Sequence, residues 1–149
     1  MHVAASPYRC ILAVALLLGG LAPPSAARAE VEAAAPAPLH QLRIYRVHPG
    51  NERAFHERFR DHALRIMDRH GFEVIATWQA QAEGRSEFVY LLQWPDEAAM
   101  KRAWAGFMAD AEWSAIKQRT GAEYGRFVDG IEDRSLRLTD YSPRRRLAD

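Results

Sequence analysis

Cysteine is almost absent from the 149-residue chain, in which Cys10 is the only one. Cys10 lies in an N-terminal segment that is expected to be removed, so the mature protein has no cysteine. Disulfide bonds, thiol nucleophiles and cysteine-ligated metals are therefore excluded for the mature protein.

A hydrophobic run long enough to span a membrane is also missing. The run from Cys10 to Ala22 has about 12 or 13 apolar residues, whereas a spanning helix needs roughly 20. Arg9 precedes this run, and Ala27-Arg28-Ala29 places small residues just before a cut at Glu30. This layout is typical of a secretory signal peptide. Residues 1–29 therefore predict an exported protein, periplasmic or secreted, with no stable membrane anchor after cleavage.

Charge of one sign is not in excess. The chain has 20 Lys and Arg against 19 Asp and Glu, and residues 1–29 hold Arg9, Arg28 and no acid. The mature chain therefore has 18 basic and 19 acidic residues, a net charge of −1 with histidine neutral. No basic stripe is present to predict a nucleic-acid partner. Residues 144–149 form a short basic tail that is expected to be solvated.

One small domain is predicted in the remainder. Residues 30–38 are rich in Ala and Pro and indicate an extended linker. Residues 39–143, roughly 100 in number, suit a single domain.

The first half of this domain predicts a strand, a turn and a helix. Residues 41–47 alternate as a strand, and Pro49-Gly50 ends it. Asn51 suits a helix N-cap, and Gly71 suits the C-terminal end of the same helix. Between them, residues 52–70 carry one apolar stripe of helical spacing, made of Phe55, Phe59, Ala63, Ile66 and Met67.

The second half predicts a hairpin, a helical region and a last strand. Residues 72–80 and 88–94 are rich in aromatic and β-branched side chains, with a polar loop between them. Asp96 is expected to cap a helix and Asp110 to restart it, with Gly121 as its end. Residues 122–130 are predicted as a loop and residues 131–141 as the last strand.

This order, β-α-β-β-α-β, predicts the α+β class with the ferredoxin-like arrangement. We expect a four-stranded antiparallel sheet with both helical segments on one face. The hairpin strands carry apolar residues on both faces, so the open face of the sheet needs a cover. A second copy of the chain is the economical cover, and we therefore expect a homodimer through this face.

Common catalytic patterns are not found. The histidines of the mature chain, His40, His48, His56, His62 and His70, lack the spacing of a metal pair, so no metal is predicted. No serine stands in a Gly-x-Ser-x-Gly elbow. His62 borders the apolar stripe, where it faces either a haem or, as we favour, a local hydrogen-bond partner.

Five segments in order resemble the NIPSNAP family. They are "LRIYRVHPGNERAFHERF", "GFEVIATW", "FVYLLQW", "DAEWSAI" and "LRLTDYSP". The resemblance covers residues 39–143 and departs from the family pattern at Ala76, close to an expected glycine. It implies a dimeric α/β barrel in which two ferredoxin-like sheets lie face to face.

Two functions are compatible with that barrel. The first, which we favour, is a homodimeric module that binds a small apolar or aromatic ligand or a protein, with no cofactor. The second is an oxidoreductase acting in the barrel cavity, either cofactor-independent or haem-dependent. The second comes from fold analogy with more distant barrel families.

Candidate ligand-binding residues follow from the strand alternation. If Leu42 and Ile44 pack on the helices, Arg43 and Tyr45 point into the barrel. A buried Arg43 needs a partner, either a ligand carboxylate or a structural acid such as Asp140. The expected ligand-binding set is completed by four further side chains: Trp78, Tyr90, Gln93 and Trp113.

Overall fold

The computed structural model describes residues 38–144 and 147. The predicted signal peptide, residues 1–29, lies outside the described residues, as do residues 30–37 of the linker and most of the tail. Within the described part, no helix is long and apolar enough to cross a membrane.

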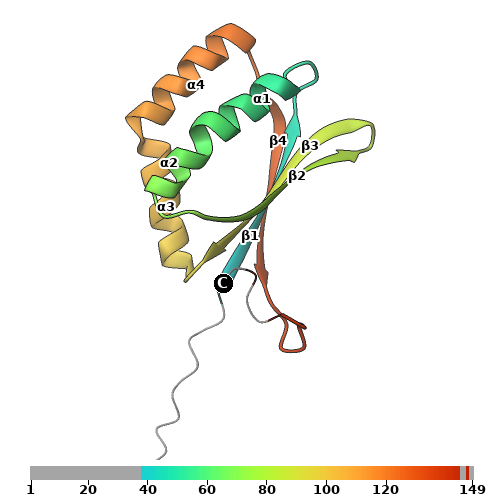
Figure 1. Ribbon diagram of the computed structural model, residues 1–149, viewed down its shortest axis with the longest axis vertical. Helices are drawn as coiled ribbons and strands as arrows, with labels where there is room; N and C mark the ends of the chain where they lie inside the picture. Colours follow the sequence, from blue (N-terminus) through green and yellow to red (C-terminus); the bar gives the residue numbers. More distant parts are fainter. Residues whose placement is uncertain (1–37, 145–146, 148–149) are drawn as a thin grey trace, which may run out of the picture. The chain divides into compact units, whose positions relative to one another are not determined.

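Four strands form one antiparallel sheet in the order β2-β3-β1-β4, and the helices cover one face of it (Figure 1). The predicted ferredoxin-like α+β fold is therefore confirmed. The elements in chain order are β1 (Leu39–Val47), α1 (Glu52–Arg58), the π-helical turn η1 (Phe59–Ala63), α2 (Leu64–Arg69), β2 (Glu73–Ala82), β3 (Arg85–Trp94), α3 (Glu97–Ala109), α4 (Ala111–Tyr124) and β4 (Val128–Arg137).

The orientation of β1 is the reverse of the one assumed from the sequence. Directly paired residues share a sheet face, and Arg43 pairs with Tyr90 while Tyr45 pairs with Phe88. Tyr90 and Phe88 belong to the row of β3 that is buried against the helices, so Arg43 and Tyr45 face the helices too. Leu42 and Ile44 lie on the other side, which we call the open face.

A β-bulge in β2 decides where Trp78 points. The pairing of β2 with β3 shifts between Val74 and Ala76, so Val74 faces the helices with Leu92. After the shift, Trp78 pairs with Val89 and lies on the open face. The unpaired residue of the bulge is Ile75, directly before Ala76, the position where the chain departs from the family pattern.

The first helical region is one continuous run from Glu52 to Arg69, as predicted, but its middle turn is π-helical. Asn51 precedes this region, although its side chain does not cap the helix. Instead, the amide of Asn51 donates hydrogen bonds to the carbonyls of Tyr124 and Arg126, both at 2.8 Å. Asn51 therefore ties the start of α1 to the end of α4.

Predicted element ends are partly right. Asp96 and Asp110 cap α3 and α4 by accepting from the backbone N–H of Ala99 and of Trp113. The expectation for Gly121 was wrong, because α4 continues to Tyr124 and ends at Gly125 with φ of 73°. A glycine costs a helix only about 1 kcal/mol, which packing of α4 outweighs. The last strand accordingly begins at Val128 and ends at Arg137.

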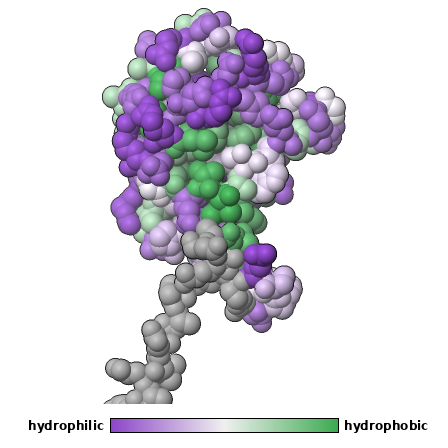
Figure 2. Space-filling view, in the orientation of Figure 1, coloured by the Kyte–Doolittle hydropathy of each residue, from purple (hydrophilic) through white to green (hydrophobic). Residues whose placement is uncertain are grey.

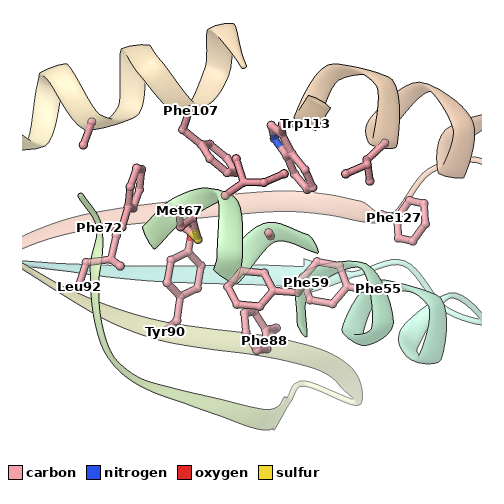
Figure 3. Packing of buried hydrophobic residues seen from close by; sticks show 14 of the residues in the cluster. Phe55, Phe59, Met67, Phe72, Phe88, Tyr90, Leu92, Phe107, Trp113 and Phe127 are labelled. Atoms are coloured by element: carbon pink, nitrogen blue, oxygen red, sulfur yellow. The ribbon is translucent and has the colours of Figure 1, made fainter. Parts of the chain in front are cut away.

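Aromatic side chains fill the space between the sheet and the helices (Figure 3). Phe88 and Tyr90 of β3 pack against Phe59, with ring centroids 4.5 and 5.3 Å from it. At the other end of the core, Phe72 lies 4.9 Å from Trp94. These contacts fix the helices over β3 and β1.

Asp110 provides a test of this packing. Its carboxylate accepts from Trp113 N–H and pairs with Arg69 and His70 at 2.7 and 2.8 Å. Hydrogen bonds from His70, from the Trp113 backbone and from Arg69 hold the pKa of Asp110 well below its usual range. A lowered folded pKa stabilises the fold above the unfolded pKa of about 3.9, and that contribution is lost as the pH falls further.

We therefore predict that Asp110→Ala lowers the melting temperature at pH 7 more than the matched cap variant Asp96→Ala. Asp96 caps α3 in the same way, without an ion pair among the described residues. The gap between the two variants should shrink as the pH falls below about 4. Thermal unfolding followed by circular dichroism measures it, and equal losses at pH 7 would contradict the role of Arg69 and His70.

Candidate functional site

An inner cavity of about 40 Å³ lies between the sheet and the helices. Its wall draws on the central strand and on every helical element. The lining residues are Tyr45, Phe55, Arg58, Phe59, Ala63, Met67, Phe107 and Trp113.

The cavity wall is built mainly from rings. Phe107 and Trp113 reach down from α3 and α4 with centroids 5.1 Å apart. Phe55 and Phe59 form the opposite side, 6.3 Å apart (Figure 3). A small void remains between these rings.

The π-helical turn Phe59–Ala63 supplies two lining residues, Phe59 and Ala63. Such a turn has one extra residue compared with an α-helical turn, so it widens the helix locally. Single π turns inside α-helices occur often at functional sites. Here the turn lies at the cavity, and it marks this part of the helix as the functional candidate.

Arg58 brings a positive charge to this aromatic wall. Its guanidinium carbon lies 3.6 Å from the ring centroid of Phe127 and 5.7 Å from that of Trp113. Its Nη1 donates to the Thr120 hydroxyl at 3.3 Å. Burial lowers the pKa of Arg58. Among residues 38–144 and 147, no carboxylate forms an ion pair with it.

A polar network begins at the cavity and runs along β1. The hydroxyls of Tyr45 and Tyr90 are 3.0 Å apart, and Arg43 Nη2 donates to the Tyr45 hydroxyl at 3.4 Å. Arg43 Nη1 pairs with Asp133 on β4 at 2.6 Å. The structural acid that pairs with Arg43 is therefore Asp133, whereas the sequence suggested Asp140.

Gln41 holds the far end of this network. Its Nε2 donates to both oxygens of Asp133, at 2.9 and 3.0 Å. Its Oε1 accepts from the indole N–H groups of Trp94 and Trp104, at 3.2 and 2.8 Å. The guanidinium of Arg43 also lies 4.7 Å over the ring of Trp104. The polar row of β1 is thus satisfied under the helices, except Arg43 Nε, which has no partner in the described part of the chain.

Tyr90 and Arg43 both keep their protons at neutral pH. Burial, reinforced by Tyr45, raises the pKa of Tyr90 far above its usual value. Burial alone would lower the pKa of Arg43, but Tyr45, Tyr90 and Asp133 more than offset it and raise the pKa. These two groups can therefore donate hydrogen bonds, and neither of them acts as a base near neutral pH.

The structure divides the six predicted ligand-binding residues between the two faces of the sheet. Arg43, Tyr45 and Tyr90 lie together under the helices, and Trp113 lines the inner cavity near Tyr45. Trp78 and Gln93 lie on the open face. Arg43 and Tyr45 were expected to face the barrel interior, and that expectation was wrong because β3 fixes the face of β1. Whether any of the six binds a ligand stays a prediction.

Arg58 was missed by sequence reasoning. It stands three residues after Phe55 and one before Phe59, beside the apolar stripe of the helix. A charged residue at that spacing borders the buried face of a helix. That position is the signal by which it could have been found.

The cavity does not fit a haem. A porphyrin is much larger than a cavity of about 40 Å³, and no histidine is among the lining residues. His62, considered for that role, lies on η1 but does not line the cavity. In the described part of the chain, no group of three or more His, Cys, Asp or Glu could hold a metal ion.

Comparison with known proteins points to one family. The sequence profile of the NIPSNAP family matches residues 40–143. A NIPSNAP-like domain protein of Burkholderia xenovorans superposes with a TM-score of 0.62 at 18% identity, covering 72% of this chain and 90% of that one. A NIPSNAP family protein of Agrobacterium tumefaciens gives 0.62 at 19% identity, covering 71% and 97%. At these identities the structures establish a shared fold. No curated protein matches the sequence.

A double-mutant cycle tests the hydroxyl pair of the network. We predict that Tyr45→Phe and Tyr90→Phe each lower the free energy of unfolding by about 0.5–1.5 kcal/mol. The double variant should lose less than both changes together, because either single change already breaks the bond. Urea unfolding measures the three variants, with Tyr141→Phe at a tyrosine that is 82% exposed as the control. Full additivity would contradict the pairing.

Proposed function

The chain belongs to the NIPSNAP family, and from that premise we propose that it is a homodimeric module that binds a small apolar or aromatic acid in the inner cavity of each copy. The observation that carries the proposal is Arg58. It is a half-buried cation in an aromatic wall, and among the described residues it has no carboxylate partner.

The charge of Arg58 calls for an anion. A cation taken out of water is costly unless it is paired, and rings and one hydroxyl compensate it only in part. A ligand carboxylate would complete the pairing through charge-assisted hydrogen bonds, which are about twice as strong as neutral ones. The aromatic lining would at the same time receive the apolar part of the ligand. The combination selects an acid with an apolar body.

The volume of the cavity and the position of the Tyr45 hydroxyl restrict the range of possible ligands further. Pockets for drug-sized ligands usually measure about 300–1,000 Å³, far more than the 40 Å³ found here. A cavity that holds one benzene ring measures about 150 Å³, so even a single-ring or short-chain acid must push the lining rings apart, and a larger ligand does not fit. Tyr45 lines the same cavity as Arg58, and its hydroxyl could hydrogen-bond a second polar group of the ligand in exchange for its contact with Tyr90.

Binding, not oxidation, is the activity that these groups support. A guanidinium and a hydroxyl hold a ligand in place, and the raised pKa of Tyr90 removes it as a base near neutral pH. An oxidation in this inner cavity would need a proton acceptor, and the polar side chains among its lining residues are those of Tyr45 and Arg58. The alternative of an oxidoreductase acting in the barrel cavity between two copies is a separate proposal that these residues do not support.

Homodimerisation through the open face is the second part of the proposal. Leu42, Ile44, Val89 and Leu91 lie on that face and are only partly buried in the single chain. A band of hydrophobic residues runs along the visible side of the sheet in Figure 2. Apolar surface of this kind on a sheet favours a second covering layer.

Matched pairs of small molecules test the ligand class. We predict that benzoate and butyrate bind the full-length protein and raise its melting temperature, whereas the uncharged benzamide and butyramide bind at least ten-fold more weakly. Arg58→Gln should remove this preference, since a charge-assisted bond is worth about 1.5–3 kcal/mol. Isothermal titration calorimetry gives the affinities, and the intrinsic tryptophan fluorescence, to which Trp113 at the cavity contributes, follows the same titrations.

Arg60→Gln is the matched control for this experiment. Arg60 lies two residues further along, is exposed and pairs with Asp61 at 2.6 Å. The Arg60→Gln variant should bind benzoate with the affinity of the unchanged protein. Equal binding of acids and amides, or full benzoate binding by Arg58→Gln, would rule out the proposed ligand class.

Export is proposed from the N-terminal pattern alone. We predict that the protein, expressed with its own N-terminus in a bacterium, is recovered from the periplasm or medium beginning at Glu30. Mass spectrometry of the purified protein identifies the first residue. Recovery of the whole chain from the cytoplasm would contradict the signal peptide.

A further inference from the structure

Trp78 stands out on the open face of the sheet. It lies on the edge strand β2 with 48% of its surface exposed, where the bulge between Val74 and Ala76 has turned it away from the helices. Covering a large aromatic side chain in this position with a partner removes apolar surface from water and stabilises the complex. Tryptophan is also among the residues that most often anchor protein interfaces.

A groove opens on the same face, toward the opposite edge of the sheet. It has a volume of about 390 Å³ and lies between the sheet and the segment that follows β4. The sheet provides Leu91 and Leu136 as its apolar floor, and Leu138, Tyr141 and Pro143 form its wall. We call it the C-terminal groove. Its size and lining suit one large aromatic side chain.

We propose that Trp78 of each copy inserts into the C-terminal groove of the other copy. This inference rests on the proposed homodimer and adds the residues that hold it together. When two copies of the sheet face each other, a two-fold axis in the plane between them can be placed midway between any two points of the face. Each of the two points then lies opposite the other point of the partner copy. The operation that brings one Trp78 over the partner's groove therefore brings the partner's Trp78 over this groove.

The open face is barely large enough to form a stable interface without an additional anchor. Four strands of nine or ten residues present a face of roughly 500–600 Å² at the usual strand spacing and rise. Two such faces bury about 1,000–1,200 Å², which is the lower limit for a stable interface. Two tryptophans seated in grooves would add buried area and a defined register.

His40 gives the groove a polar group suited to an indole. Gln93 Nε2 donates to the Glu73 carboxylate at 3.1 Å, so Gln93 Oε1 faces His40 Nε2, also at 3.1 Å. Since that oxygen only accepts, Nε2 carries the hydrogen, and in the tautomer protonated at Nε2 alone Nδ1 is an acceptor. His40 is 2% exposed and lines the groove. A buried indole N–H usually finds an acceptor, and this ring can offer one.

Complementary variants of the full-length protein test the contact. Trp78→Glu and Leu136→Arg should each weaken dimerisation at least ten-fold, measured by light scattering across a concentration series. When the two variants are mixed, a heterodimer should form, because Glu at 78 then meets Arg at 136 in one site while the other site keeps the native pair. Met108→Arg changes an exposed residue of α3 and should stay dimeric.

Each possible result distinguishes between the homodimer and the Trp78 contact. A monomeric unchanged protein would overturn both the homodimer and the Trp78 contact, and would leave the benzoate result as it stands. A dimer that persists in Trp78→Glu would overturn the contact and keep the homodimer. Two monomeric variants that fail to associate on mixing would show that position 78 and the groove do not meet. Circular dichroism establishes that both variants are folded.

Discussion

Burial of the polar row of β1 under the helices is the constraint on which the rest of the structure depends. Gln41, Arg43 and Tyr45 belong to the central part of the sheet, and each must find partners away from water. The partners come from three other elements: Tyr90 from β3, Asp133 from β4 and the indole of Trp104 from α3. Satisfying this one row therefore fixes the neighbouring strands and the position of α3 together.

The two candidate sites follow from that arrangement. On the helix side, Tyr45 marks the boundary between the polar network and the inner cavity, where Arg58 faces aromatic rings without an acid beside it. On the open side, strand alternation leaves Leu42, Ile44 and their neighbours facing solvent, with Trp78 and the C-terminal groove at the two edges. We propose the first as the site of a small acid and the second as the contact with another copy of the chain.

Local features account for most differences between the expected and observed structure. The predicted hairpin loop is shorter than expected, because Glu83 and Gly84 adopt positive φ values of 52° and 73° and close a two-residue turn. The π turn at Phe59–Ala63 leaves the apolar spacing of its helix nearly unchanged, so periodicity cannot detect it. The bulge beside Ala76 is likewise silent in the sequence pattern, although it decides the face of Trp78.

The sequence by itself determined the order of elements, the helix caps at Asp96 and Asp110, the family and the need to cover both faces of the sheet. These properties depend on periodicity and on contacts between residues close in the chain. Tertiary structure alone decided which face of β1 meets the helices, that Asp133 pairs with Arg43, and that Arg58 lies at a cavity. A shift of one residue moves a strand's side chains to the other face, and only pairing with β3 selects the register.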